Sequence, residues 1–368
     1  MAPHRSGTIT SSYEEDTIAT RDDYRIIENE YVRDILNQPR ALADTLQGLS
    51  VPSGLQIILQ RLGREEFRRI VLTGMGSSFH VLYPLRTLLT SHGYTVVMAE
   101  TSELLHYLPK LFDPRTLMIV VSQSGRSAEI VRLLAENRRR AAIIAVTNTD
   151  DSPLALEADA AFLTRAGQEF SVSCKTYVTA LMVLHQVGTL LCNMNREEMD
   201  SELAEVVPSA SDYLHSWRDH VMELADSLAG VRHIFVAGRG PSLAAAGTGG
   251  LIIKESVHYH AEGMSSAAFR HGPLEMVSED TFVVVLAGEE RTKTLNTRLL
   301  EDIRRKGGRA ELLGTDARLL SLRIAAVPDS VLPILEILPL EVITLALAAR
   351  TGIEAGRFSL ASKVTTIE

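Results

Sequence analysis

The chain contains few cysteines and tryptophans and has no excess of positive charge. Its 368 residues include 2 cysteines and 1 tryptophan, and aromatic residues make up 5%. Two cysteines are too few for a disulfide framework or a zinc knuckle, so we expect a reducing cytoplasm. Acidic residues outnumber basic ones, 46 to 37, which disfavours nonspecific binding to nucleic acid or to an acidic membrane surface.

Long uninterrupted hydrophobic runs are also missing. The first 25 residues are polar and contain no apolar segment of the signal-peptide kind. The most apolar stretch, Leu332–Ala349, is interrupted by two glutamates and two prolines, so we expect a buried helix and not a membrane span. With 45% hydrophobic and 23% charged residues, the composition is typical of a cytoplasmic globular protein, either an enzyme or a small-molecule sensor.

One sequence pattern occurs twice in the chain. Residues 68–78 have a basic start, a short β-branched run and a Gly-x-Gly turn, and residues 232–242 repeat that order. Helical periodicity is found between apolar runs, for example in Ala128–Arg140 and Thr292–Lys306. The later predicted strands are Thr116–Ser122, Ala142–Thr147, Thr281–Leu286 and Arg309–Gly314. Apolar strands alternating with helices indicate parallel sheets covered on both faces.

We therefore predict an α/β protein with two tandem, doubly wound, flavodoxin-like domains, each a parallel sheet flanked by helices. Residues 1–45 would form a flexible tail and a helical lead-in, and residues 46–205 the first domain. A helical connector, 206–219, would lead to the second domain, 220–368. This division agrees with the length of the chain, which suits two domains.

Ligands of open parallel sheets bind at the carboxyl ends of the strands, so the loops there are the candidate sites. The first loop, Gly74–His80, combines two glycines with two serines at the start of the next helix. Dinucleotide binding is the rival interpretation, with Glu100 as a possible ribose partner. Neither copy of the repeated pattern carries the third glycine of the dinucleotide fingerprint.

The second loop is richer in hydrogen-bond donors. It places Ser122, Gln123, Ser124 and Ser127 around Gly125 at a predicted strand-to-helix junction. Exposed N–H groups at a helix start favour an anion such as phosphate. A serine there can also be a plain helix cap, but four donors this close exceed what capping requires. We therefore interpret residues 122–127 as a phosphate-binding loop.

At this loop the sequence resembles the sugar isomerase (SIS) domain family, whose signature is Ser-Gln-Ser-Gly-x-(Ser/Thr). The tandem arrangement resembles the isomerase half of glucosamine-6-phosphate synthase. Further matches follow in order along the chain from about residue 30: Gln38-Pro39, Asn148, Ser152–Leu154, Ala166–Glu169, Lys175, Thr179, Gly238–Gly240, Lys254-Glu255, His260–Glu262, His271–Leu274 and Lys363–Glu368.

The resemblance implies roles for individual residues. It places the sugar phosphate on Ser78, Ser122, Gln123, Ser124 and Ser127, and closes the pocket with the backbone of Val172 and Ser173. Glu255 matches the catalytic base and His271 the histidine associated with ring opening, which in the synthase reaches the neighbouring subunit's site. Lys363 matches the C-terminal lysine that can form an imine with an open-chain ketose. The resemblance implies no cofactor or metal. It does imply a homodimer with its active site at the subunit interface.

These residue types suit a proton transfer between neighbouring carbons. A buried carboxylate can remove and return a carbon-bound proton, an imidazole can shuttle protons to oxygen, and a lysine can form an iminium. From spacing alone Glu255 could equally be a surface carboxylate paired with Lys254, and His271 could cap a turn. The resemblance favours the catalytic roles for both.

Two other patterns have simpler interpretations. His258, His260 and Glu262 alternate like ligands on a strand, but the preceding stretch, Ala244–Ser256, is predicted to be a helix that ends in a polar turn. We therefore predict no metal site. Cys174, beside Lys175, stands where a small hydroxyl residue is expected, and we interpret it as packing.

Departures from the pattern narrow the function. No counterpart of the glutaminase half is present in these residues, so we expect no ammonia release from glutamine. Ile252 and Thr248 stand where the synthase has a lysine and a glutamate near the base, and the segment before Cys174 is one residue shorter. Stand-alone relatives of this length include amino-sugar phosphate deaminases, ketosamine 6-phosphate deglycases and tagatose-type isomerases.

The leading hypothesis is a deaminase or deglycase type of enzyme that acts on a 6-phosphorylated amino sugar or ketosamine and releases the amine. The alternatives are a plain aldose–ketose isomerase, an ammonia-dependent isomerase like the synthase, and a phosphosugar sensor without catalysis. The acidic lead-in is too short for a DNA-binding helix-turn-helix module of the kind such sensors carry. Retention of Glu255, His271 and Lys363 also favours an enzyme.

Overall fold

The computed structural model describes residues 26–360 and Lys363, so the expected flexible tail and the last five residues of the terminal motif lie outside the described residues. The first sheet contains β1 (Arg69–Gly74), β2 (Val96–Glu100), β3 (Thr116–Val121), β4 (Ala142–Thr147) and β5 (Ala160–Leu163). The second contains β6 (His233–Gly238), β7 (Ala261–Ser265), β8 (Thr281–Leu286) and β9 (Arg309–Leu313).

Both sheets are wholly parallel and share one winding. Their strand orders are β2-β1-β3-β4-β5 and β7-β6-β8-β9, so the second sheet repeats the first without its last strand. Equivalent positions keep their register, because Ile70 pairs with Leu117 and Ile234 with Phe282. The first order is the flavodoxin-like one, in which successive strands are added on opposite sides of β1, so that the order of winding reverses between β1 and β3. The predicted duplicated, doubly wound α/β fold is confirmed.

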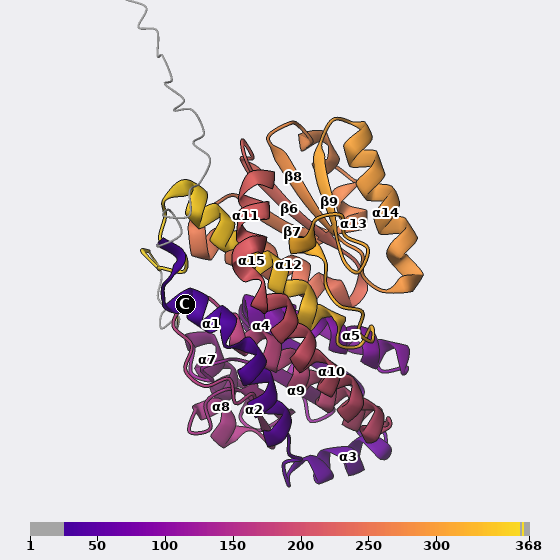
Figure 1. Ribbon diagram of the computed structural model, residues 1–368. Coiled ribbons are helices and arrows are strands. Elements are labelled where there is room, and N and C mark those ends of the chain that lie inside the picture. Colours follow the sequence, from indigo (N-terminus) through magenta and orange to yellow (C-terminus); the bar gives the residue numbers. More distant parts are fainter. Residues whose placement is uncertain (1–25, 361–362, 364–368) are drawn as a thin grey trace, which may run out of the picture.

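Helices cover both sheets (Figure 1). The central strands are apolar on both faces: Leu117, Ile119 and Val121 of β3 join one core cluster, and Met118 and Val120 join another on the opposite face. In the first domain the helices are α3 (Leu55–Gly63), α4 (Ser77–His80), α5 (Leu82–Ser91), α6 (Thr101–Tyr107), α7 (Ala128–Asn137), α8 (Pro153–Glu157) and α9 (Lys175–Leu191). In the second they are α12 (Leu243–Val257), α13 (Ser266–Phe269), α14 (Glu290–Arg305) and α15 (Leu332–Thr351).

Four more helices complete the frame. The lead-in forms α1 (Glu30–Leu36) and α2 (Gln38–Gly48), and the segment between the sheets forms α10 (Arg196–His215) and α11 (Trp217–Ser227). The expected connector is therefore helical, and α10 continues through Pro208. These helices pack against others distant in sequence, α2 against α9 and α11 against α15.

Helix α15 is the apolar stretch singled out in the sequence. Among residues 26–360 it is the one helix long and apolar enough to cross a membrane, with a mean hydropathy of 1.9 over 18 residues, but 94% of that window is buried inside the protein. It packs along α11 and α12. Its two glutamates, Glu336 and Glu341, are at most 1% exposed. The expectation of a buried core helix is confirmed.

Candidate active site

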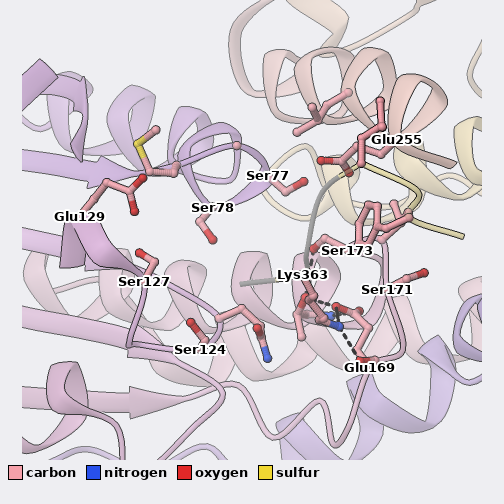
Figure 2. Close-up of a pocket in the computed structure, with 18 of the residues that line it drawn as sticks. Ser77, Ser78, Ser124, Ser127, Glu129, Glu169, Ser171, Ser173, Glu255 and Lys363 are labelled. Carbon is pink, nitrogen blue, oxygen red and sulfur yellow. Dashed lines mark hydrogen bonds and ion pairs between the residues drawn. The ribbon is translucent and has the colours of Figure 1, made fainter. Parts of the chain in front are cut away.

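A cavity of about 540 Å³ opens at the carboxyl edge of the first sheet (Figure 2). The loops after β1 and β3 form one side, the segment before α9 forms another, and the end of α12 and the C-terminal segment close it. Eight of the ten residues proposed from the sequence line it, and seven of these are Ser78, Gln123, Ser124, Ser127, Val172, Glu255 and Lys363. The eighth is Ser173.

The loop after β3 leaves two serine hydroxyls available for a ligand. Ser127 occupies the N-cap position of α7, but its hydroxyl makes no capping hydrogen bond. The Ser124 hydroxyl only accepts a long hydrogen bond, 3.4 Å, from the N–H of Arg126. Gly125 has φ of +61°, a conformation that glycine adopts without strain. Both serines therefore fit a phosphate cradle at a helix start better than a plain cap.

Ser122 has a different place from the one expected. It follows β3, is 7% exposed and does not line the cavity. Its hydroxyl accepts a hydrogen bond from the N–H of Gly125, at 3.2 Å. It therefore shapes the loop from beneath, because that bond folds the turn back onto the strand end.

The first loop supplies two more hydroxyls. After β1 the chain turns at Gly76, where φ is +54°, and enters the four-residue helix α4. This turn brings Ser77 and Ser78 into the cavity lining. Figure 2 shows Ser78, Ser124 and Ser127 on one side of the cavity, with Glu255 across from them.

Glu255 reaches this cavity from the second domain. It lies near the end of α12, which packs against α4 of the first domain. Gly247 permits that approach, because a Cβ there would lie 2.8 Å from the His80 ring. Burial raises the pKa of Glu255 to about 7, although the charge of Lys254 opposes the shift. Lys254 instead lies 3.7 Å from Glu262, so it does not neutralise Glu255 in a close ion pair.

Glu169 organises the segment before α9. One of its carboxylate oxygens, Oε1, accepts hydrogen bonds from the N–H groups of Cys174 and Thr176, each at 3.0 Å, and Oε2 accepts one from the Thr176 hydroxyl at 2.7 Å. The Glu169 side chain is 1% exposed. Hydrogen bonds to a carboxylate are stronger than neutral ones, so this residue fixes Val172 and Ser173 at the cavity wall.

Lys363 closes the same wall. Its Nζ donates to the backbone oxygen of Glu169 at 2.5 Å and lies 3.2 Å from Oε2 of that residue (Figure 2). The amine therefore lies inside the cavity, held by a carboxylate. Cys174, which the sequence suggested was packing, is fully buried, and burial raises the pKa of its thiol well above the usual value.

His271 lies apart from the other proposed catalytic residues. It follows α13 on the surface and does not line the cavity of its own chain. Its backbone N–H donates to Ala268, in keeping with the turn-capping alternative, and its side chain is exposed. Within one chain, then, the structure brings Glu255 and Lys363 together but leaves His271 outside.

The alternating His258, His260 and Glu262 do not converge. His258 ends α12 with φ of +53° and lines the cavity, His260 contacts His233 at 3.2 Å, and Glu262 contacts Lys254. No group of three or more histidine, cysteine or acidic side chains suited to a metal is found among the described residues.

Several residues that line the cavity of Glu255 were not predicted from the sequence. Glu129 and Thr176 stand close to the proposed motifs, and Glu169 is within one of them, so motif proximity was the available signal. Leu251 precedes Glu255 by one helical turn and therefore shares its face. Phe358 carries no such signal, because only the path of the chain after α15 brings it to the cavity.

Fold and site together define a class of protein: a duplicated parallel α/β fold with a donor-rich loop at a strand edge and a titratable carboxylate facing it, suited to a small anionic ligand. The chain belongs to the SIS domain family, a family of phosphosugar isomerases. The family model matches residues 65–190 and 227–316, more than half of the chain, and the two segments coincide with the two sheets. The dinucleotide alternative is thereby set aside.

Curated relatives extend the likeness across the whole fold. The chain is 29% identical over 354 residues to the glutamine–fructose-6-phosphate aminotransferase of Pyrococcus horikoshii, covering 93% of this chain and 58% of that protein. It is 27% identical over 360 residues to the enzyme of that name from Streptomyces coelicolor, covering 92% and 58%. The chain thus spans less than three fifths of the length of these relatives.

Solved structures show the same fold. The C-terminal domain of glucosamine-fructose-6-phosphate aminotransferase from Francisella tularensis superposes with a TM-score of 0.78 at 20% identity, covering 89% of this chain and 98% of that one. Glucosamine-6-phosphate deaminase from Thermotoga maritima gives 0.71 at 16% identity, covering 92% and 100%. Proteins with different names therefore share this architecture, and specificity has to be argued from the site.

Proposed function

We propose that this protein is an enzyme that transfers a proton between C1 and C2 of a 6-phosphorylated amino sugar or ketosamine and thereby releases the amine. The observation that carries the proposal is one cavity that combines a serine-rich helix start with a carboxylate whose pKa burial raises to about 7. The serines suit the phosphate, and such a carboxylate can both accept and return a proton near neutral pH.

The proposed chemistry balances without a cofactor. With a ketosamine, Glu255 removes a proton from C1 while the C2 carbonyl oxygen gains one, giving an enaminol. The protonated carboxyl then returns its proton to C2 as the nitrogen on C1 loses one. The product is an imine at C1, which water hydrolyses to the aldose phosphate and free amine. With a 2-amino aldose, the proton moves from C2 to C1, and the imine at C2 gives the ketose phosphate and ammonia.

The surroundings of the base support amine release over synthase-type chemistry. Ile252, where the synthase has a lysine, is fully buried in the core. Thr248, where the synthase has a glutamate, is buried and lies 3.4 Å from Nδ1 of His80. Burial lowers the pKa of His80 to about 4, so that ring is neutral near pH 7. The positions that carry charges in the synthase pattern are therefore uncharged here.

The proposal includes a homodimer. The family pattern gives His271 a role in ring opening, and in this chain that residue is exposed and outside its own cavity. A second subunit that contributes its His271 would complete the site and supply the acid–base group for the ring oxygen.

The direct test is an assay of amine release. Purified protein is incubated with glucosamine 6-phosphate and with a panel of ketosamine 6-phosphates, and ammonia, free amine and sugar phosphate are quantified. We expect stoichiometric amine and sugar phosphate from at least one substrate, and release that is slower by about a hundredfold or more from the Glu255→Gln variant. Interconversion of aldose and ketose phosphates without amine release would identify a plain isomerase, and binding without turnover a sensor.

A further inference from the structure

A second cavity of about 320 Å³ lies outside the site described above. Its walls come from both domains: α5 and α9 of the first, the start of α10, and the segments around Pro241 and Pro333 of the second. It shares no lining residue with the cavity of Glu255. Preformed concave sites of this size between domains are typical binding sites for small molecules.

The apolar floor of this cavity is closely packed. Leu85, Leu181 and Leu184 line it and are at most 5% exposed. Helices α5 and α9 approach closely there, because a Cβ on Gly188 would lie 2.6 Å from Leu88. Side chains packed this tightly do not collapse to fill a space, so the cavity is present before any ligand arrives.

One polar atom in the floor has no hydrogen-bond partner. Thr189 is 1% exposed and lines the cavity, and its hydroxyl oxygen makes no hydrogen bond among the described residues. Buried hydroxyls are nearly always paired, and leaving one unpaired costs roughly 1–3 kcal/mol. A ligand with a polar group at this depth would satisfy it.

The polar part of the lining is predominantly acidic. Its carboxylates are Glu198, Glu202, Glu289 and Asp329. Arg291, the one arginine or lysine among the described lining residues, lies 2.7 Å from Glu289. His185 contacts Glu202 at 2.8 Å, and burial lowers its pKa below the usual value although Glu202 opposes the shift, so the ring adds little positive charge. The field in this cavity therefore favours a cation.

We propose that this interdomain cavity binds a small ligand with an apolar body and a positively charged amine. The apolar body would lie against the leucines, and the amine would lie among the carboxylates on the side of Thr189, which follows His185, the partner of Glu202, by one helical turn. Anionic compounds such as the sugar phosphates proposed for the first site are disfavoured there. This inference is independent of the proposed function, because it concerns a different cavity with the opposite charge.

Helix α9 connects this cavity to the first one. Thr176 in its first turn lines the cavity of Glu255, and Leu184 lines the interdomain cavity. Eight residues separate them, which is about 12 Å along a helix. A ligand that shifts the C-terminal half of α9 would therefore reach the segment that Glu169 holds at the sugar site.

The test is calorimetric binding of three matched probes: cyclohexylamine, cyclohexanol and cyclohexanecarboxylate. We expect the amine to bind at least tenfold more tightly than the carboxylate, with the alcohol between them. The experiment is repeated on Glu255→Gln protein to show that the catalytic cavity is not responsible. Absence of binding by all three probes, or equal binding of amine and carboxylate, would overturn the proposal.

Two variants locate the binding. Leu184→Trp fills the floor and should weaken cyclohexylamine binding at least tenfold, whereas Leu156→Trp, at a residue 70% exposed on α8, should not. Should Leu184→Trp fail to fold, Thr189→Val serves instead: it keeps the shape, removes the unpaired hydroxyl and should weaken cyclohexanol binding severalfold without loss of thermal stability. Unchanged affinities in the folded variants would place the probes elsewhere and overturn the assignment.

Discussion

A single carboxyl group, that of Glu255, decides most of the chemistry proposed for this protein. Its sequence neighbour Lys254 suggested a surface ion pair as the simpler interpretation. In the structure Lys254 lies near Glu262, and Glu255 faces the cavity. Burial raises the pKa of Glu255 to about 7, which is the range a general base needs to exchange protons near neutral pH.

Turnover should depend on pH through the ionisation of Glu255. The base acts in its deprotonated form, so kcat should rise with pH up to about 7 and level off above it. Glu255→Gln should lower kcat by about 10²- to 10⁴-fold or more and leave phosphosugar affinity nearly unchanged. Initial rates and calorimetric binding across pH 5–9 measure both effects.

Lys254→Met provides the matched control for that profile. The charge of Lys254 lowers the pKa of Glu255, so its removal should move the acid limb of the profile to higher pH. A limb that does not move in Lys254→Met, or a Glu255→Gln protein that retains activity, contradicts the assignment of Glu255 as the base.

At the scale of elements, the loop between β3 and α7 depends on one glycine. Gly125 has φ of +61°, and a Cβ there would lie 2.2 Å from the Ser152 hydroxyl at the start of α8. Gly125→Ala should therefore displace the loop and weaken binding of glucosamine 6-phosphate at least tenfold, as measured by calorimetry.

Gly93→Ala separates backbone strain from loop displacement. Gly93 also has positive φ, +84°, but nothing lies within 4 Å of a Cβ built there. This variant should lose about 1 kcal/mol of stability and bind the phosphosugar normally. Equal binding by both alanine variants would count against the loop as the phosphate site.

Helix α15 carries a buried carboxyl that links stability to pH. Burial raises the pKa of Glu336 to about 8, although a hydrogen bond from Ser242 opposes the shift. Between pH 4.5 and 8 the folded protein keeps a proton that the unfolded chain releases, so this residue's contribution favours folding at low pH and is lost as pH rises, by at most about 1.4 kcal/mol per unit.

Glu336→Gln removes that linkage. At pH 8 the variant should be more stable than the unmodified protein by an amount on the order of 2–4 kcal/mol, and the difference should shrink as pH falls toward 5. Urea unfolding at a series of pH values measures it, with Glu136→Gln, an exposed residue of α7, as control. A difference independent of pH would show that Glu336 is not the titrating group.

At the scale of the whole molecule, the two domains are not equivalent despite their shared fold. The first contributes the serine loops, and the second contributes Glu255 through the contact of α12 with α4. His271 of the second domain lies outside this shared cavity. Both domains of one chain therefore form this cavity. In the proposed homodimer, the remaining residue, His271, would come from the second subunit.

That proposal predicts complementation between inactive variants. Glu255→Gln and His271→Ala should each be inactive alone, but a mixture should regain up to about a quarter of normal activity, because half of the randomly formed dimers contain one site with both native residues. Activity is assayed after subunit exchange. The control for dilution mixes Glu255→Gln protein with Leu156→Trp protein, whose proposed catalytic residues are all native. A mixture that stays inactive despite verified exchange contradicts a shared site.

Strand and helix positions were predictable from the sequence because their causes are local. Predicted helix 244–256 is observed as α12, and strand 142–147 as β4, since apolar periodicity follows from which faces are buried. Predicted helix 128–140 ends three residues early, because Arg138 adopts the left-handed conformation. The apolar stretch after residue 332 was correctly interpreted as a buried helix.

The tasks of individual side chains were less predictable. Ser122 and Ser124 look alike in the motif, but one hydroxyl shapes the loop and the other faces the cavity. Glu169 carried no assigned role, although it holds both the segment before α9 and Lys363. Such roles depend on partners far away in the chain, and no local pattern records them.

By itself the sequence determined the duplicated α/β fold, its family and the serine-rich loop at a strand end, because periodicity and short motifs report local conformation and burial. Only the tertiary structure decided that Glu255 crosses from the second domain to the first domain's loops, that its pKa is raised and that His271 lies outside. Those facts depend on how α12 packs against α4, and burial and proximity are properties of the assembled molecule.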